Sequence, residues 1–132
     1  MLDLFRILLV VFIAMHGAVH VIWFLAAWTP VSAGVKDGPW ILPGNITIHS
    51  PLGRALGLLA LAVVFVFIFA AIGLLLKQVW WAGWAEVGVF MSFGAVVPWL
   101  RQSPGSTAVT AIIANIVLMF LLALELSLDL IA

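Results

Sequence analysis

The chain has 132 residues, of which 67% are hydrophobic and 8% are charged, and its formal net charge at pH 7 is zero. Soluble domains carry about a quarter charged residues. A core of this size cannot bury so much apolar surface, so the lipid bilayer is the expected solvent. The balanced charge gives no basis for nucleic-acid binding. Because the chain has no cysteine, disulfides, thiolate metal sites and thiol catalysis are excluded.

Four apolar stretches are long enough to cross a membrane, which takes about 20 residues each. No repeat or change of composition divides the chain, so the sequence predicts one all-α integral membrane domain over residues 1–132. This domain is a four-transmembrane-helix bundle. The short turn at Lys77-Gln78 predicts that the second and third spans are antiparallel neighbours. The four predicted spans cover residues 4–28, 52–76, 79–100 and 108–131.

The longest predicted loop, residues 29–51, lies between the first and second spans. Two short β-prone runs, Trp40–Leu42 and Ile46–Ile48, flank a Pro-Gly-Asn turn. This pattern predicts a short β-hairpin-like loop. Ser50 and Pro51 then have the residue types of an N-cap and a first-turn proline for the second span.

Small residues predict where helices pack closely. Gly53 and Gly57 stand at small-xxx-small spacing at the start of the second span, and Gly17 lies in the first span. Such residues let helix backbones approach one another. The basic residues are divided almost evenly between the two predicted sides and do not decide the orientation. We expect both termini in the cytoplasm, because the long loop then faces outward.

Four polar side chains in the predicted spans are the candidate site. His16 and His20 are four residues apart and fall on one face of a helix, and polar or ionisable groups inside a span are functional hypotheses by default. Asn115 and Glu86 are the other two candidates. At 1.5 Å per residue, His20 lies about 12 Å and Asn115 about 10 Å from the same membrane face. These depths allow a hydrogen bond between His20 and Asn115 if the first and fourth spans touch, whereas Glu86 stops about 7 or 8 Å short of His16.

Three interpretations of the histidine pair stay open. His16 and His20 could supply two ligands of a metal site, with Glu86 or Asn115 as a third. One imidazole could be the axial ligand of a haem or pigment, although a bis-histidine haem within the chain is disfavoured because both rings lie on one helix. Otherwise each ring makes a hydrogen bond to a carbonyl, to Asn115 or to water and stabilises helix packing. No cofactor is required by the sequence.

Several short sequence blocks outside the 29–51 loop resemble those of a group of bacterial membrane proteins. The chain resembles small bacterial four-span membrane proteins whose first helix has an H-G-x-x-H signature, a group loosely similar to DoxX-like proteins. The resemblance implies a four-helix fold and a multi-pass location in the bacterial inner membrane, and it implies no reaction. The third span, with Glu86 and Pro98, matches that pattern less well. The matching blocks are Arg6-Ile7-Leu8-Leu9, His16-Gly17-x-x-His20, Gly53-Arg54-Ala55-Leu56-Gly57, Gly73–Leu76 before Trp80-Trp81, and Asn115-Ile116.

Two functions follow as predictions. The first is a non-enzymatic integral membrane protein, an accessory or assembly subunit of a larger complex that contacts partner helices, a second copy, pigments or quinone-like lipids. The spans hold too few polar groups for a transport path. The second is a protein that binds an apolar ligand, metal or haem, with or without catalysis, through His16, His20, Glu86 and Asn115. It requires these four side chains to converge on one cavity.

Overall fold

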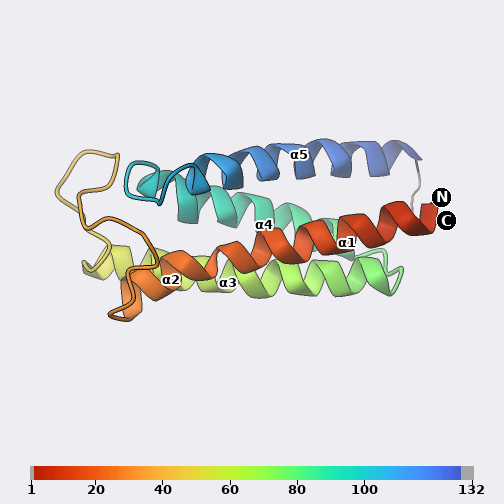
Figure 1. Cartoon of the computed structure of the whole chain (residues 1–132). Helices are drawn as coiled ribbons and strands as arrows, with labels where there is room; N and C mark the ends of the chain where they lie inside the picture. The colour runs from red at the N-terminus through yellow and green to blue at the C-terminus, as the bar shows by residue number, and fades with distance from the viewer. Residues whose placement is uncertain (1, 129–132) are drawn as a thin grey trace.

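The computed structural model describes residues 2–128, with side chains for residues 3–124. The long helices lie side by side along a common direction (Figure 1), and no strand is present in the described chain. The end of the predicted fourth span, residues 129–131, lies outside the described residues. The elements in chain order are α1 (Leu2–Val19), α2 (Val21–Trp28), α3 (Pro51–Leu75), α4 (Trp81–Val96), the 3-10 helix η1 (Val97–Trp99) and α5 (Thr107–Leu128).

Three helical segments are long and apolar enough to cross a membrane. They are Asp3–Trp28, Pro51–Leu75 and Thr107–Leu124, with 26, 25 and 18 residues. Helix α4 has 16 residues, which corresponds to about 24 Å. By itself it is shorter than a hydrocarbon layer of about 30 Å.

The predicted first span, residues 4–28, is two helices that form one rod, α1 followed by α2 (Figure 1). The break falls at His20. Its backbone N–H donates to the carbonyl of Gly17, three residues earlier, at 3.1 Å, and its own carbonyl accepts from the N–H of Trp23 at 3.3 Å. These tighter three-residue hydrogen bonds replace the four-residue spacing of an α-helix for one turn.

Helix α3 packs against α1, α2 and α4, and α4 packs against α5. The chain needs only the residues between Leu75 and Trp81 to pass from α3 to α4, so these helices are antiparallel neighbours, as predicted. The predicted start of the second span is also confirmed. The Ser50 hydroxyl accepts a hydrogen bond from the N–H of Gly53 at 3.1 Å, and Pro51 begins α3.

The loop between α2 and α3 does not form a pair of strands. One backbone hydrogen bond, from the N–H of Trp40 to the carbonyl of Ile46 at 2.8 Å, joins its two predicted arms. An antiparallel pair would also have a bond from the N–H of Ile46 to the carbonyl of Trp40, and this bond is absent from the described loop. The neighbouring Ile41 N–H instead donates to the carbonyl of Pro98 at 3.0 Å. The loop is therefore hydrogen-bonded to η1, and the β-hairpin is not confirmed.

The glycines predicted to pack helices have different neighbours. A Cβ at Gly57 would lie 2.6 Å from the Cβ of Ala27, so α2 and α3 approach closely there. Gly53 faces the backbone of Thr47 and Ile48. Its small size therefore serves the contact with the loop rather than a contact between helices.

Two apolar clusters fill the bundle, one toward the α3–α4 turn and one toward the α2–α3 loop. On α1, α4 and α5, the positions between these two clusters hold polar residues. The first cluster contains Leu9, Ile13, Val63, Phe67, Ala70, Ala71, Leu74, Trp81, Ala85, Val89, Leu118 and Leu122. The second contains Trp23, Ala26, Ala27, Val35, Ile48, Ala60, Ala95, Val96, Trp99, Ala108 and Ala111.

Candidate functional site

Four buried polar side chains form a layer between the two apolar clusters, called the polar layer below. His16 belongs to α1, His20 to the α1–α2 break, Ser92 to α4 and Asn115 to α5. His16 is 6% exposed and the other three are 0% exposed. Buried polar groups cost free energy unless they are hydrogen-bonded, so the question is where their donors and acceptors find partners.

The polar layer is joined by four hydrogen bonds. His16 Nε2 lies 2.7 Å from Asn115 Oδ1, and Asn115 Nδ2 donates to Ser92 Oγ at 2.8 Å. Ser92 Oγ lies 2.6 Å from His20 Nε2. His20 Nδ1 lies 2.9 Å from the backbone carbonyl oxygen of His16. The four side chains thus make a closed circuit that begins and ends at His16.

The circuit has one consistent direction. A backbone carbonyl can only accept, so Nδ1 of His20 carries the proton and donates to it. In a neutral imidazole the other nitrogen, Nε2, then accepts from the Ser92 hydroxyl. The hydroxyl oxygen accepts from the amide of Asn115, whose carbonyl accepts from Nε2 of His16. Each of these groups is satisfied by neutral partners, which is the condition under which a buried polar network stabilises a fold.

The His20 side chain also replaces a backbone hydrogen bond that is lost at the helix break. Because its N–H bonds to Gly17, the carbonyl of His16 loses the partner that an unbroken α-helix would supply. The His20 side chain donates to this carbonyl from Nδ1. The break therefore leaves no buried carbonyl unpaired at His16.

The Phe67 side chain of α3 packs against the two imidazoles. Its ring centroid is 4.9 Å from that of His16 and 6.1 Å from that of His20. Glycines on two helices make room for it. A Cβ at Gly17 would lie 2.6 Å from Phe67 Cβ, and a Cβ at Gly88 would lie 2.8 Å from Phe67 Cε1. Helix α3 thus contributes an apolar wall to the polar layer.

The hydrogen bond that matching depths allow between His20 and Asn115 is not formed, because Asn115 bonds to His16 and His20 bonds to Ser92. Depth depends only on the rise along each helix and does not determine this pairing. His16 and His20 are about one helical turn apart on the same face, and helix tilt and side-chain reach decide which of two such residues a partner meets.

Ser92 was not predicted. Its only signal is a single hydroxyl between Met91 and Phe93 in a run of apolar residues. A serine in an apolar helix often bonds to a carbonyl of its own helix, so the sequence does not distinguish a local bond from a bond between helices. Here Ser92 is the point at which α4 joins the circuit.

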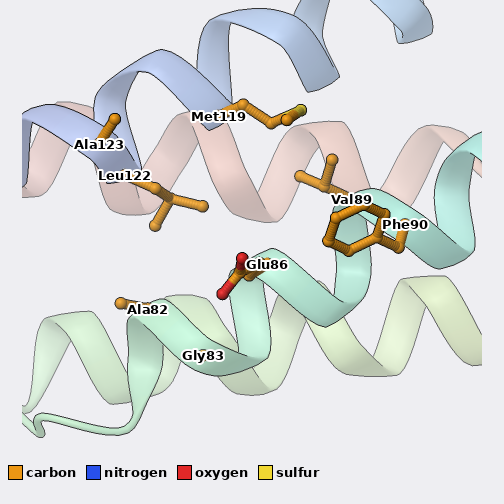
Figure 2. A pocket seen from close by; sticks show the side chains of 8 residues that line it. All are labelled: Ala82, Gly83, Glu86, Val89, Phe90, Met119, Leu122 and Ala123. Atoms are coloured by element: carbon orange, nitrogen blue, oxygen red, sulfur yellow. The ribbon is translucent and has the colours of Figure 1, made fainter.

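Glu86 does not join the polar layer. Its side chain is exposed and lines a separate groove between α4 and α5. Figure 2 shows its carboxyl group pointing from α4 toward Leu122 of α5. The structure thus brings together three of the four predicted site residues, adds Ser92, and leaves Glu86 outside.

The polar layer does not supply the ligand set of a zinc ion, although Nδ1 of His16 makes no hydrogen bond to a described residue. Nε2 of both histidines is already bound to a neighbour, and the remaining side chains offer an amide and a hydroxyl, which are poor zinc ligands. Within the described residues, no three His, Cys, Asp or Glu side chains are placed to hold a metal. Coordination at His16 or His20 through Nε2 would first require the circuit to break.

No protein-family model, curated protein or solved structure matches this chain. The resemblance to small bacterial four-span proteins therefore stays a prediction, and the function is argued from the geometry above.

Proposed function

We propose that the chain is a non-enzymatic integral membrane protein that serves as an accessory or assembly subunit of a larger membrane complex. The observation that supports this function is the closed circuit of the polar layer. His16, His20, Ser92 and Asn115 bond to one another and to a backbone carbonyl. Their hydrogen-bonding groups are used to hold helices together, so the layer is suited to stability rather than to chemistry on a substrate.

The proposal includes four membrane crossings. Helix α4 with 16 residues continues into η1 with three. At about 1.5 Å per α-helical and about 2.0 Å per 3-10 residue, the two together reach about 30 Å, the thickness of the hydrocarbon layer. Four crossings place both termini on one side, which we assign to the cytoplasm of a bacterial inner membrane.

The outward surface supports a role in contacts. Large apolar side chains project from the bundle, including Phe65 on α3, Phe90 on α4 and Phe120 on α5, which are 65%, 62% and 71% exposed. Lipid can cover such side chains, and so can the helices of a partner. This surface fits a protein whose exterior is available for assembly.

The alternative, an apolar ligand, metal or haem site, depends on convergence of the four predicted residues on one cavity. Glu86 lies apart from the other three, and those three are bonded within the circuit. The arrangement therefore favours the assembly function.

The test is to crosslink the protein in its own membrane at its natural abundance and to measure the mass of the product after mild detergent extraction. We expect a complex of fixed stoichiometry. Phe90→Ala, Phe120→Ala and Phe65→Ala, each on a different helix, should identify the contact face by releasing the chain while its helix content is unchanged. Recovery of monomer alone from the native membrane would overturn the proposal.

A further inference from the structure

The groove that contains Glu86 has properties that the assembly function does not use. It lies between α4 and α5 and has a volume of about 270 Å³. Glu86 is the charged residue in its described lining, and the others are small or apolar (Figure 2). The lining residues are Ala82, Gly83, Glu86, Val89, Phe90, Met119, Leu122 and Ala123.

Glu86 needs a partner that the described chain does not supply. Among the described side chains it makes no hydrogen bond or ion pair; the ion pair found there joins Arg6 to Asp3. It lies about 7 or 8 Å along the helix from the start of α4. Trp80 and Trp84, residues typical of the membrane interface, flank that start. A carboxyl group on an apolar surface at this depth is costly unless it is paired.

The groove changes character along its length. The small residues Ala82, Gly83 and Ala123 line the end nearest the α3–α4 turn, and Phe90 and Met119 line the other end (Figure 2). A second apolar groove of about 340 Å³ adjoins it on α5 and shares Met119 and Ala123 with it. The polar group thus lies near the membrane interface, and an apolar channel leads from it along the helices.

We propose that this groove binds a phospholipid whose headgroup carries a primary ammonium. The ammonium pairs with the Glu86 carboxylate, and an acyl chain lies along Phe90 and Met119 into the adjoining groove. An anionic headgroup would be repelled by the carboxylate. A quaternary ammonium has no N–H to donate and is usually held by several aromatic faces, whereas Phe90 is the aromatic side chain in this lining.

This lipid site goes beyond the assembly function and does not depend on it. The groove can be occupied in the isolated protein as well as in a complex, so the experiment uses the purified full-length chain. A monomer that binds the lipid would contradict only the assembly proposal, and a stable complex without lipid preference would contradict only the lipid site.

The experiment is native mass spectrometry of the protein in mild detergent. Phosphatidylethanolamine, phosphatidylcholine and phosphatidylglycerol with identical acyl chains are added in turn. We expect phosphatidylethanolamine to bind about fivefold more tightly than the other two, the value of a modest ion pair. Glu86→Gln should remove this preference. Asp37→Asn, which removes a carboxylate from the α2–α3 loop, should keep it.

A second variant tests the groove without touching the charge. A Cβ at Gly83 meets nothing within 4 Å, so Gly83→Leu can be accommodated and should fill the end of the groove nearest the α3–α4 turn. We expect lipid binding to fall while helix content is unchanged. Val87→Leu, on the exposed face of α4 outside the groove, is the matched control. Equal binding of the three lipids, or a preference that survives both Glu86→Gln and Gly83→Leu, would overturn the proposal.

Discussion

Nε2 of His16 and Oδ1 of Asn115 lie 2.7 Å apart although the two residues are 99 positions apart in the chain. The bond joins α1 to α5, while the extensive helix packing runs from α1 through α3 and α4 to α5. This hydrogen bond therefore joins the first helix of the bundle directly to the last. Several of the following predictions depend on this bond.

Asn115→Leu is expected to destabilise the protein. Leucine has the same number of side-chain heavy atoms and the same branching at Cγ, but it removes the acceptor of His16 and the donor to Ser92. Buried groups left without partners cost about 1–3 kcal/mol, and hydrogen bonds between membrane helices measure nearer 0.6 kcal/mol. We expect a loss of about 1–2 kcal/mol in the free energy of unfolding, measured by reversible unfolding in mixed micelles.

The control for this variant is Ser106→Ala, which removes an exposed hydroxyl before α5 and should leave stability unchanged. Because Ser92 and Asn115 belong to one circuit, Ser92→Ala combined with Asn115→Leu should cost less than the sum of the single effects. Strictly additive effects would show that the circuit does not act as a unit.

His20→Phe is expected to loosen the α1–α2 break. The variant keeps an aromatic ring but removes the donor to the His16 carbonyl and the acceptor for Ser92. The freed carbonyl then has no partner unless the helix rearranges. We expect faster amide hydrogen exchange around residues 16–23, with no change in α3. His49→Phe, in the exposed loop, is the control, and unchanged protection in His20→Phe would contradict the role assigned to this ring.

Two glycine variants should change stability in opposite directions. At Gly17 a Cβ would lie 2.6 Å from Phe67 Cβ, so Gly17→Ala must push α1 and α3 apart, at about 1–3 kcal/mol. At Gly83 a Cβ meets nothing within 4 Å, so Gly83→Ala should stabilise α4 by about 0.5–1 kcal/mol. Both values come from the same unfolding measurement. A neutral Gly17→Ala would mean that Phe67 can move away from the imidazoles.

The positions of the helices could be predicted from apolar length and from local signals. Ser50 and Pro51 mark the start of α3, and the short turn at Lys77 and Gln78 determines that α3 and α4 are neighbours. The break at His20 could not be predicted in this way, because no proline or glycine interrupts the helix at that residue. The break costs little free energy because the His20 side chain replaces the lost backbone donor.

The candidate site was predicted by residue type but not by pairing. His16, His20 and Asn115 are conspicuous because each is polar inside an apolar run. Which imidazole ring contacts Asn115 depends on helix tilt, and the rise per residue gives no information on tilt. In the sequence, Ser92 cannot be distinguished from a serine that bonds within its own helix. Only the position of α4 beside the imidazoles shows its role. Glu86 belongs to another face of α4, a relationship that depth alone does not reveal.

Three of the four imidazole nitrogens of His16 and His20 are hydrogen-bonded, and this predicts a colourless, metal-free protein. Nε2 of His16 and of His20 is bound to Asn115 and Ser92 respectively, and a metal or haem iron at either Nε2 would have to displace these neighbours. An absorption spectrum and elemental analysis of protein purified from its native membrane test this. A pigment band or a stoichiometric metal that disappears in His16→Ala or His20→Ala would instead support the cofactor function.

Single-cysteine labelling tests the fourth crossing, because the chain contains no cysteine of its own. Gln78→Cys lies in the turn before α4, and Ser106→Cys lies in the connection after it. If α4 and η1 cross the membrane, a membrane-impermeant thiol reagent added to intact cells reaches only one of the two. We expect Ser106→Cys to react, because it lies on the side of the long α2–α3 loop, and Gln78→Cys to react only after the membrane is opened. Reaction of only Gln78→Cys in intact cells would keep four crossings but reverse the orientation, whereas reaction of both or neither would place them on one side and reduce the crossings to three.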